Sequence, residues 1–181
     1  MKLLLILFEN IEVNSLKDFL TKRFNFEIAE VKSDYPIYNV RGAQISANDL
    51  IPKIWAKRIK ERADFALGVT GRDLFANTSN YVFGLASPDK KVGLVSLSRL
   101  YDPGTELFLD RSIKESMHEL GHVFGLEHCK NKSCVMNLSN SVQELDHKSK
   151  DFCSTCQQIL PKEKILPSKR NKWNKMIEKK F

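Results

Sequence analysis

The first third of the chain alternates between apolar stretches with the spacing of a strand and apolar stretches with the spacing of a helix. Residues 2–8 form a continuous apolar run, typical of a strand buried on both faces of a sheet. A helix capped by Asn14 or Ser15 is predicted next, because apolar side chains recur there every three or four residues. Near-alternating apolar residues over 26–31 predict a second strand. This order predicts a β-α-β opening with a right-handed crossover.

The next stretch is predicted to be irregular and then helical. Residues 34–46 contain Pro36 and Gly42, which break regular structure. A helix is predicted after them, with Asn48 as its cap. Its predicted buried face consists of Leu50, Ile51, Ile54, Trp55 and Ile59.

Strand and helix spacings continue up to residue 124. Strands are predicted over 65–70, 81–86 and 92–96, because each of these stretches is rich in apolar residues and bounded by turn residues. A long helix follows over about 107–124. Alternating strands and helices predict an α/β fold.

Length and hydropathy place the chain among soluble proteins of one compact domain. Its 181 residues are enough for a full hydrophobic core. No apolar run approaches the roughly 18 residues that a membrane span needs. The apolar start is too short for a signal peptide and lacks a small-residue cleavage site. We therefore expect a cytoplasmic protein without membrane contact.

The basic character of the chain is confined to its last residues. Of the net charge of +7, most comes from residues 161–181, which hold eight Lys or Arg against two Glu. We therefore expect a domain over 1–160 and a basic helix or tail over 161–181. Docking of this segment as an amphipathic helix is favoured over a free tail, and binding to nucleic acid or a membrane surface is the weaker interpretation.

A metal-binding pattern lies at the end of the long predicted helix. Residues 118–128 read H-E-x-x-H-x-x-G-x-x-H. His118 and His122 are one helical turn apart, so both imidazoles can reach one zinc ion. Glu119 lies beside them and can take a proton from a water molecule that the ion activates. The competing interpretation is an ordinary amphipathic helix with solvated histidines.

The end of the same pattern supplies a third ligand. Gly125 can adopt the left-handed conformation that ends many helices. The chain can then turn so that His128 comes back to the metal. Three protein ligands leave one position open, which is the pattern of a catalytic zinc rather than a structural zinc.

Four cysteines follow the histidines in two close pairs. Cys129 and Cys134 form the first pair, and Cys153 and Cys156 form the second. This layout is typical of a structural zinc site over residues 129–156, so we expect two zinc ions per chain. Because Cys129 is adjacent to His128, the second ion would fix the segment that carries the third histidine. A redox pair, two disulfides and an iron–sulfur cluster remain alternatives.

The pattern over 118–156 resembles the metzincin metalloproteases and, within them, the archaemetzincin family. The run H-E-x-x-H-x-x-G-x-x-H-C-x-x-x-x-C-x-M, followed by C-x-x-C, carries this resemblance. It implies a single metzincin-like domain with a twisted, mostly parallel sheet, an antiparallel edge strand and the zinc-binding helix. It also implies that Met136 forms the Met-turn beneath the zinc, although an ordinary core methionine is the simpler reading.

The resemblance also gives the predicted edge strand a role. In metzincins an antiparallel edge strand borders the cleft and pairs with an extended substrate, and residues 81–86 are the candidate here. The alternative is a strand that only completes the sheet. Asp73 is expected to be a turn or cap residue, with a structural hydrogen bond near the site as the alternative. His147 is expected on the surface.

Together these features predict a zinc metallopeptidase acting on a peptide or protein substrate. His118, His122 and His128 would hold the catalytic zinc, and Glu119 would be the general base. A catalytically silent zinc protein of the same fold that binds a peptide or a partner is the first alternative. A nucleic-acid-associated protein that uses the basic tail and the four-cysteine site is the second.

Overall fold

A computed structural model describes residues 1–24, 26–36 and 38–160. Within them the main sheet has the strand order β2-β1-β5-β8-β7. Its strands are β1 (Lys2–Leu7), β2 (Glu27–Lys32), β5 (Phe65–Thr70), β7 (Gly84–Ser87) and β8 (Val92–Ser96). The first four in spatial order run parallel, and β7 pairs antiparallel with β8 at one edge. The mostly parallel α/β sheet with an antiparallel edge strand is therefore confirmed.

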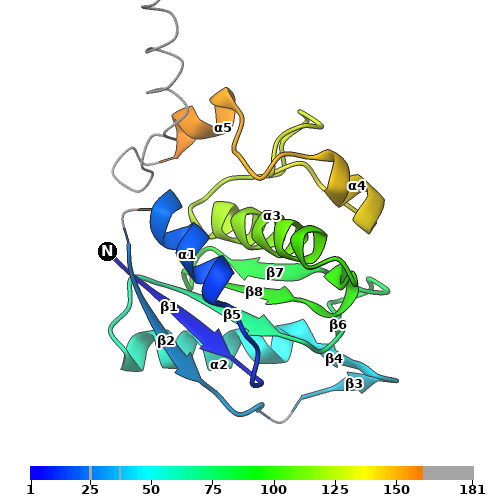
Figure 1. Cartoon of the computed structure of the whole chain (residues 1–181). Helices are drawn as coiled ribbons and strands as arrows, with labels where there is room; N and C mark the ends of the chain where they lie inside the picture. Colours follow the sequence, from blue (N-terminus) through cyan, green and yellow to red (C-terminus); the bar gives the residue numbers. More distant parts are fainter. Residues whose placement is uncertain (25, 37, 161–181) are drawn as a thin grey trace, which may run out of the picture.

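Helices cover both faces of this sheet. Helices α1 (Asn14–Arg23) and α3 (Thr105–Val123) lie on one face, and α2 (Ala47–Lys60) lies on the other (Figure 1). Strand β1 divides its side chains between them: Leu3 and Leu5 pack in the core with α1 and α3, whereas Leu4 packs with α2. A strand buried on both faces needs an unbroken apolar run, which explains the pattern of residues 2–8.

The predicted buried face of α2 is wrong at two positions. Trp55 is 42% exposed and Ile59 is 53% exposed, whereas Leu50 and Ile54 are fully buried. At about 100° per residue, Ile59 lies on the opposite side of the helix from Leu50, so the two cannot share a buried face. The apolar residues therefore predicted correctly that a helix forms here, but not which of its faces packs against the sheet.

The predicted helix caps are also wrong. Val13 occupies the N-cap position of α1 and Ser46 that of α2, and neither makes a side-chain cap hydrogen bond. Asn48 lies inside α2, where its amide donates to the side chain of Asn77 at 3.2 Å. Cap residues are common in loops for other reasons, so their presence fixed the helix starts only to within one or two positions.

Short elements account for the remaining differences. The predicted irregular stretch contains β3 (Val40–Arg41) and β4 (Gln44–Ser46), which form a small second sheet with β6 (Leu74–Phe75). The strand predicted over 81–86 begins only at Gly84, although Val82 bridges to Leu74. A 3₁₀ turn, η1 (Ser98–Leu100), follows β8.

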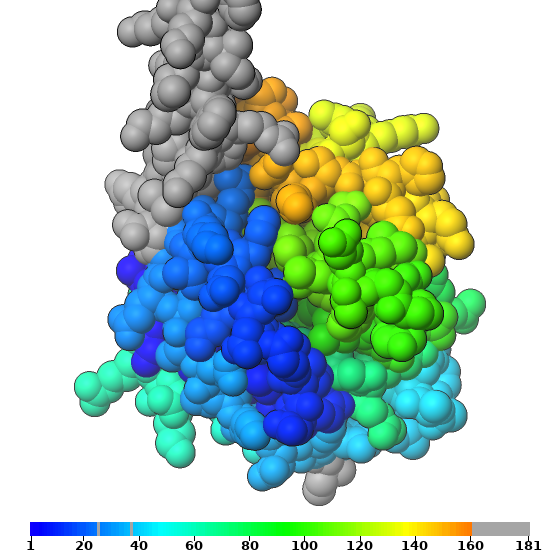
Figure 2. Space-filling model, in the orientation of Figure 1, coloured from blue at the N-terminus to red at the C-terminus, as the bar shows by residue number. Residues whose placement is uncertain are grey.

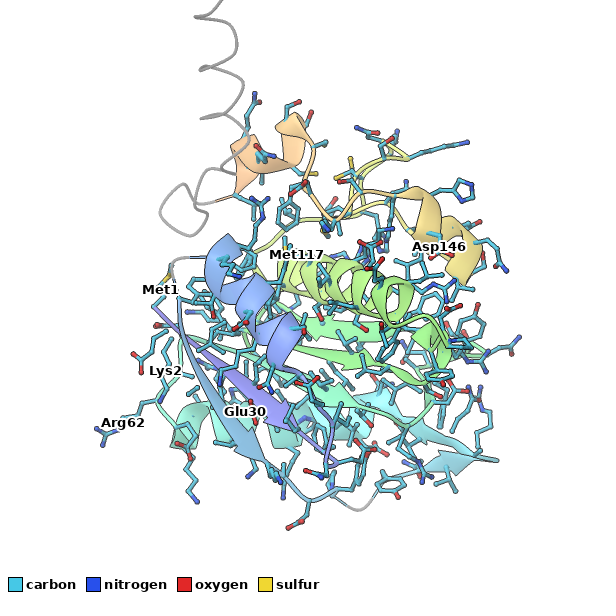
Figure 3. The ribbon with its side chains drawn as sticks, viewed as in Figure 1. Met1, Lys2, Glu30, Arg62, Met117 and Asp146 are labelled. Atoms are coloured by element: carbon cyan, nitrogen blue, oxygen red, sulfur yellow. The ribbon has the colours of Figure 1, made fainter. Side chains whose placement is uncertain are left out.

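The segment after α3 lies over that helix, on the side away from the sheet (Figure 1). It contains α4 (Val142–His147) and α5 (Ser154–Ile159), neither of which was predicted. Figure 2 shows it in yellow and orange, gathered above the green residues of α3. Asp146, labelled in Figure 3, belongs to α4 of this segment. Its carboxylate accepts two hydrogen bonds of 2.7 Å from Arg111 and so holds the segment on α3.

In the part of the chain that the structure describes, no helix is long and apolar enough to cross a membrane. The expected cytoplasmic location stays a prediction. The boundary expected at residue 160 also stays a prediction, because the basic segment over 161–181 lies outside the described residues.

Candidate active site and metal centres

Three histidines converge at the C-terminal end of α3. His118 and His122 lie one turn apart on this helix, with their Nε2 atoms 3.1 Å from each other. One ligand atom from each of these residues and from His128 fits within 4.8 Å of the others. A tetrahedral zinc ion holds its nitrogen ligands about 3.4 Å apart, so the three imidazoles are close to the arrangement that such an ion requires.

A helix-ending motif brings His128 back to the other two histidines. Gly125 has φ +94°, and its N–H donates to the carbonyl of His122 at 2.9 Å. The N–H of Leu126 reaches the carbonyl of Gly121 at 2.9 Å. These two bonds form a Schellman motif, which reverses the chain immediately after the helix. The left-handed glycine expected at this position is confirmed.

The hydrogen bonds of the histidines fix which nitrogen is available. Nδ1 of His118 lies 2.8 Å from the carbonyl of Val135, and Nδ1 of His122 lies 2.8 Å from the carbonyl of Leu126. A carbonyl only accepts, so each Nδ1 carries the proton and each Nε2 keeps a lone pair for a metal. Burial lowers the pKa of His118 to about 3, and it also lowers the pKa of His122. Neutral imidazoles with free Nε2 atoms fit a zinc ion.

Glu119 lies in the same pocket and is almost completely buried. Its Oε2 has no hydrogen-bond partner among the described residues. Burial, followed by the nearby Glu115, raises the pKa of Glu119 well above its usual range. The side chain packs directly on β7: a Cβ added to Gly84 would lie 2.6 Å from Cγ of Glu119. The carboxylate is therefore held between the helix and the edge strand.

A pocket of about 590 Å³ contains these groups. The three histidines and Glu119 line it together with Gly84, Leu85 and Ala86 of the edge strand and with residues 138–140. Strand β7 has only one neighbour in the main sheet as described, so its outer edge is open beside the pocket. This position is the one that an extended peptide would need in order to pair with the strand.

Three further pocket residues were not singled out by sequence reasoning. Glu115 and Lys148 are 4% and 3% exposed, and both line the pocket. Ser139 lines it too, and its Oγ has no hydrogen-bond partner among the described residues. Glu115 precedes Glu119 by one helical turn, so helix spacing could have found it. Lys148 lies in a stretch of polar residues that looks solvated, and only the packing of α4 on α3 buries it.

Met136 supports the metal-binding helix from the other side. It is fully buried, and a Cβ added to Gly121 would lie only 2.2 Å from its sulfur atom. The same added atom would lie 3.0 Å from the ring of Phe152. A side chain at position 121 would displace Met136 or Phe152, because both pack against the helix backbone there.

The four cysteines form a second cluster. Their Sγ atoms all lie within 4.8 Å of one another, and all four are free thiols. Sγ of Cys129 is 3.8 Å from that of Cys153, and Sγ of Cys134 is 3.7 Å from that of Cys156. Tetrahedral Zn–S bonds place sulfur atoms about 3.8 Å apart, so the cluster fits one zinc ion. The alternative of two disulfides is not met, because none of the four cysteines is paired.

Two remaining candidates lie outside both clusters. His147 is on the surface at the end of α4, as expected, with its Nδ1 2.6 Å from the carbonyl of Gln143. Asp73 accepts two hydrogen bonds of 2.8 Å from Arg99, whose guanidinium lies 4.0 Å from the ring centre of Tyr81 at the pocket. The turn or cap role expected for Asp73 is wrong, and the structural hydrogen bond near the site is confirmed.

Comparison with known proteins gives one consistent family. The model of peptidase family M54 matches residues 30–162. An archaemetzincin of Methanopyrus kandleri is 38% identical over 170 residues, covering 88% of this chain and 95% of the relative. A crystal structure of archaemetzincin from that organism matches with a TM-score of 0.82 and 35% identity, over 90% of this chain and 94% of that chain.

A second solved structure agrees with the first. Archaemetzincin from Archaeoglobus fulgidus, complexed with malonate, matches with a TM-score of 0.77 and 35% identity. The match covers 88% of this chain and 100% of that chain. The chain therefore belongs to peptidase family M54, the archaemetzincins, and is a zinc metallopeptidase.

Proposed function

We propose that this chain hydrolyses peptide bonds at the pocket over α3, with His118, His122 and His128 holding zinc and Glu119 acting as general base. One observation carries the proposal. The three histidines, with Nε2 available on His118 and His122, and Glu119, with its unpartnered carboxylate oxygen, line the same pocket. When bound, the zinc ion would activate a water molecule and polarise the scissile carbonyl.

Glu119 would carry the proton through the reaction. Its buried, unpartnered oxygen is suited to accept a proton from the attacking water and to pass it to the leaving amine. Burial favours the protonated carboxyl, so the group holds the proton readily between the two steps. Contact with Gly84 keeps the carboxylate in place beside the metal ligands.

Strand β7 would hold the substrate. Its open edge offers main-chain donors and acceptors to an extended peptide, and it runs along the pocket that contains Glu119. Binding through the main chain tolerates many sequences, so the side chains around the pocket would set the specificity.

The four cysteines would hold a second, structural zinc ion. The N–H of Cys129 donates to the carbonyl of Met136 at 2.8 Å, and the side chain of Asn137 donates to the carbonyl of Cys129 at 2.7 Å. These bonds connect Cys129 to the turn at Met136, which packs against α3. Because His128 directly precedes Cys129, an ion on the thiolates would fix the position of the third histidine.

The test is cleavage of peptide mixtures by the zinc-loaded protein, followed by mass spectrometry. Glu119→Gln keeps the shape of the side chain and removes the base, so turnover should fall by at least about 100-fold while zinc stays bound. Elemental analysis checks the zinc, and His147→Gln on the exposed end of α4 is the matched control.

Two results would contradict this proposal. Equal cleavage by Glu119→Gln and wild type would remove Glu119 from the mechanism. No cleavage by the zinc-loaded wild type, across peptides of different lengths and end groups, would favour the catalytically silent zinc protein. The basic tail that the nucleic-acid alternative needs, residues 161–181, lies outside the described residues.

A further inference from the structure

The pocket contains a buried cation that the proposed reaction does not use. Lys148 is only 3% exposed, and its side chain lines the pocket. Its Nζ makes one hydrogen bond, of 2.8 Å, to the carbonyl of Asn137. No carboxylate of the described residues lies within ion-pair distance of it. An ammonium group has three donors, and burying it without an anionic partner is costly.

A second unused donor lies on the same stretch of chain. We call residues 137–148 the wall segment, since it lines the pocket at residues 138–140 and at Lys148. Ser139 is half-buried, and its hydroxyl has almost no exposed surface and no hydrogen-bond partner among the described residues. Two donors of the wall segment are therefore short of acceptors, and both line one pocket.

The charges around the pocket favour an anionic ligand once the metal is present. The carboxylates that act most strongly on Lys148 are Glu115 and Glu119, and both belong to α3 rather than to the wall segment. A zinc ion on the histidines would offset negative charge on Glu115 and Glu119 and leave the positive charge of Lys148 uncompensated. A carboxylate offers several acceptor sites, which suits an ammonium and a hydroxyl together.

We propose that Lys148 and Ser139 bind a carboxylate of the substrate, so that this peptidase selects peptides with an acidic group near the bond that is cut. The proposal rests on the proposed function and adds a substrate class to it. An acidic side chain and the free C-terminus of a short peptide present the same chemistry, and the experiment separates them.

The experiment measures the binding of matched hexapeptide sets to the zinc-loaded protein by fluorescence polarisation. Four sets are compared. The central residue is Asp or Glu in two of them and Asn or Gln in the other two, and each kind is made with a free and with an amidated C-terminus. A hydrogen-bonded charge pair predicts that the preferred carboxylate improves binding roughly tenfold or more. Preference for Asp and Glu identifies a side-chain site, and preference for the free C-terminus identifies a terminal-carboxylate site.

Variants then connect the preference to the wall segment. Lys148→Met should abolish it, Lys148→Arg should retain most of it, and Ser139→Ala should weaken it. Lys150→Met is the matched control, because Lys150 lies two residues away and pairs with Asp110 rather than lining the pocket. If Lys148→Met does not fold, the Arg and Ser139→Ala variants decide the question.

Equal binding of acidic and neutral peptides to the wild type would overturn the proposal, as would a preference that survives both Lys148→Met and Ser139→Ala. Mass spectrometry of the same mixtures reports cleavage separately. Carboxylate-dependent binding without cleavage would therefore count against the peptidase mechanism alone, whereas cleavage without any carboxylate preference would count against this inference alone.

Discussion

Two glycines mark the closest approaches around the histidine cluster. A Cβ at Gly84 would lie 2.6 Å from Glu119, and one at Gly121 would lie 2.2 Å from Met136. Real Cβ atoms do not come this close to other heavy atoms, so any side chain at either position would displace its neighbour. At the residue scale, the position of the Glu119 carboxylate therefore depends on the absence of a Cβ atom at Gly84 of β7.

Gly84→Ala should lower peptide cleavage by about 100-fold, because a displacement of about 1 Å at a reacting group has an effect of that size. Zinc content should stay at the wild-type value, since the three atoms nearest to the added Cβ all belong to Glu119, which is not one of the proposed ligands. Gly71→Ala is the control, because an added Cβ there meets nothing closer than 3.9 Å. Unchanged kcat/KM in Gly84→Ala would show that Glu119 does not need its present position.

The buried histidine should make the metal-free protein sensitive to acid. Burial depresses the pKa of His118 to about 3 in the folded state, whereas an unfolded histidine has a pKa of about 6.5. As pH falls below about 6.5, the unfolded state takes up the proton first, so stability is lost progressively down to about pH 3. The loss should be on the order of 4 kcal/mol.

Denaturant unfolding of the metal-free protein at pH 7 and pH 4 measures this effect. In His118→Asn the difference in unfolding free energy between the two pH values should be smaller than in wild type. His147→Asn, on the surface, is the matched control. An identical pH dependence in wild type and His118→Asn would refute the assignment of acid sensitivity to this histidine.

Sequence spacing brought out the histidines, Glu119 and the cysteines because their chemistry is local or nearly so. Five of these residues lie within twelve positions of one another, from His118 to Cys129. Lys148 was not predicted as a site residue, because its sequence neighbours are polar and are also typical of a solvated lysine. Its burial comes from the packing of α4 over α3, through Arg111 and Asp146, which are 35 positions apart. The metal and catalytic roles of all these residues stay predictions.

At the scale of elements, α3 is held between the sheet and the segment that follows it. Strands β7 and β8 pack on one side, and Met136 and Phe152 press against Gly121 on the other. Phe152 directly precedes Cys153, and Met136 follows Cys134 by two positions. Each cysteine pair therefore brings one large apolar side chain against the helix that carries His118, on the side away from the sheet.

Phe152→Ala should remove this support. Phe152 is 2% exposed, so its truncation leaves a cavity under α3 and should lower the free energy of unfolding by about 3–5 kcal/mol. Ile159→Ala on α5 is the control, since Ile159 is 64% exposed and should change stability by less than about 0.5 kcal/mol. Urea titration distinguishes the two, and equal small effects would mean that Phe152 does not support the helix.

Element prediction succeeded where a segment was long or buried on both faces. The bounds of β5 and β8 were predicted to the residue, and α3 was predicted to within two residues of its start. Strands of two or three residues, and helices of six, are held by their surroundings rather than by their own spacing, which explains why β3, β4, α4 and α5 were missed. The exposed face of α2 was misassigned because apolar residues surround much of that helix.

At the scale of the whole molecule, the two proposed metal sites are unequal. His128 belongs to the histidine site but is attached to Cys129, whereas all four cysteines lie outside the long helix that carries His118 and His122. Loss of His122 should therefore remove one zinc ion and leave the other. Loss of a thiolate should weaken both sites, because it frees the segment that carries His128.

Elemental analysis of purified variants measures this asymmetry. Wild type should contain two zinc ions per chain, His122→Ala about one, and Cys134→Ala fewer than one after dialysis against a mild chelator. His147→Ala should match wild type, since this residue lies outside both clusters. A Cys134→Ala protein that keeps one zinc ion and full cleavage activity would show that the two sites are independent.

The open edge of β7 has a consequence for the protein in bulk. An unpaired strand edge accepts any extended chain, including that of another copy, so the feature that would receive a substrate also favours self-association at high concentration. The strand is only four residues long, contains Gly84 and is followed by Pro88, and each of these properties limits how far a second strand could extend along it. Because β7 is short, its edge can stay open to a substrate peptide while giving a second copy of the chain little length for pairing.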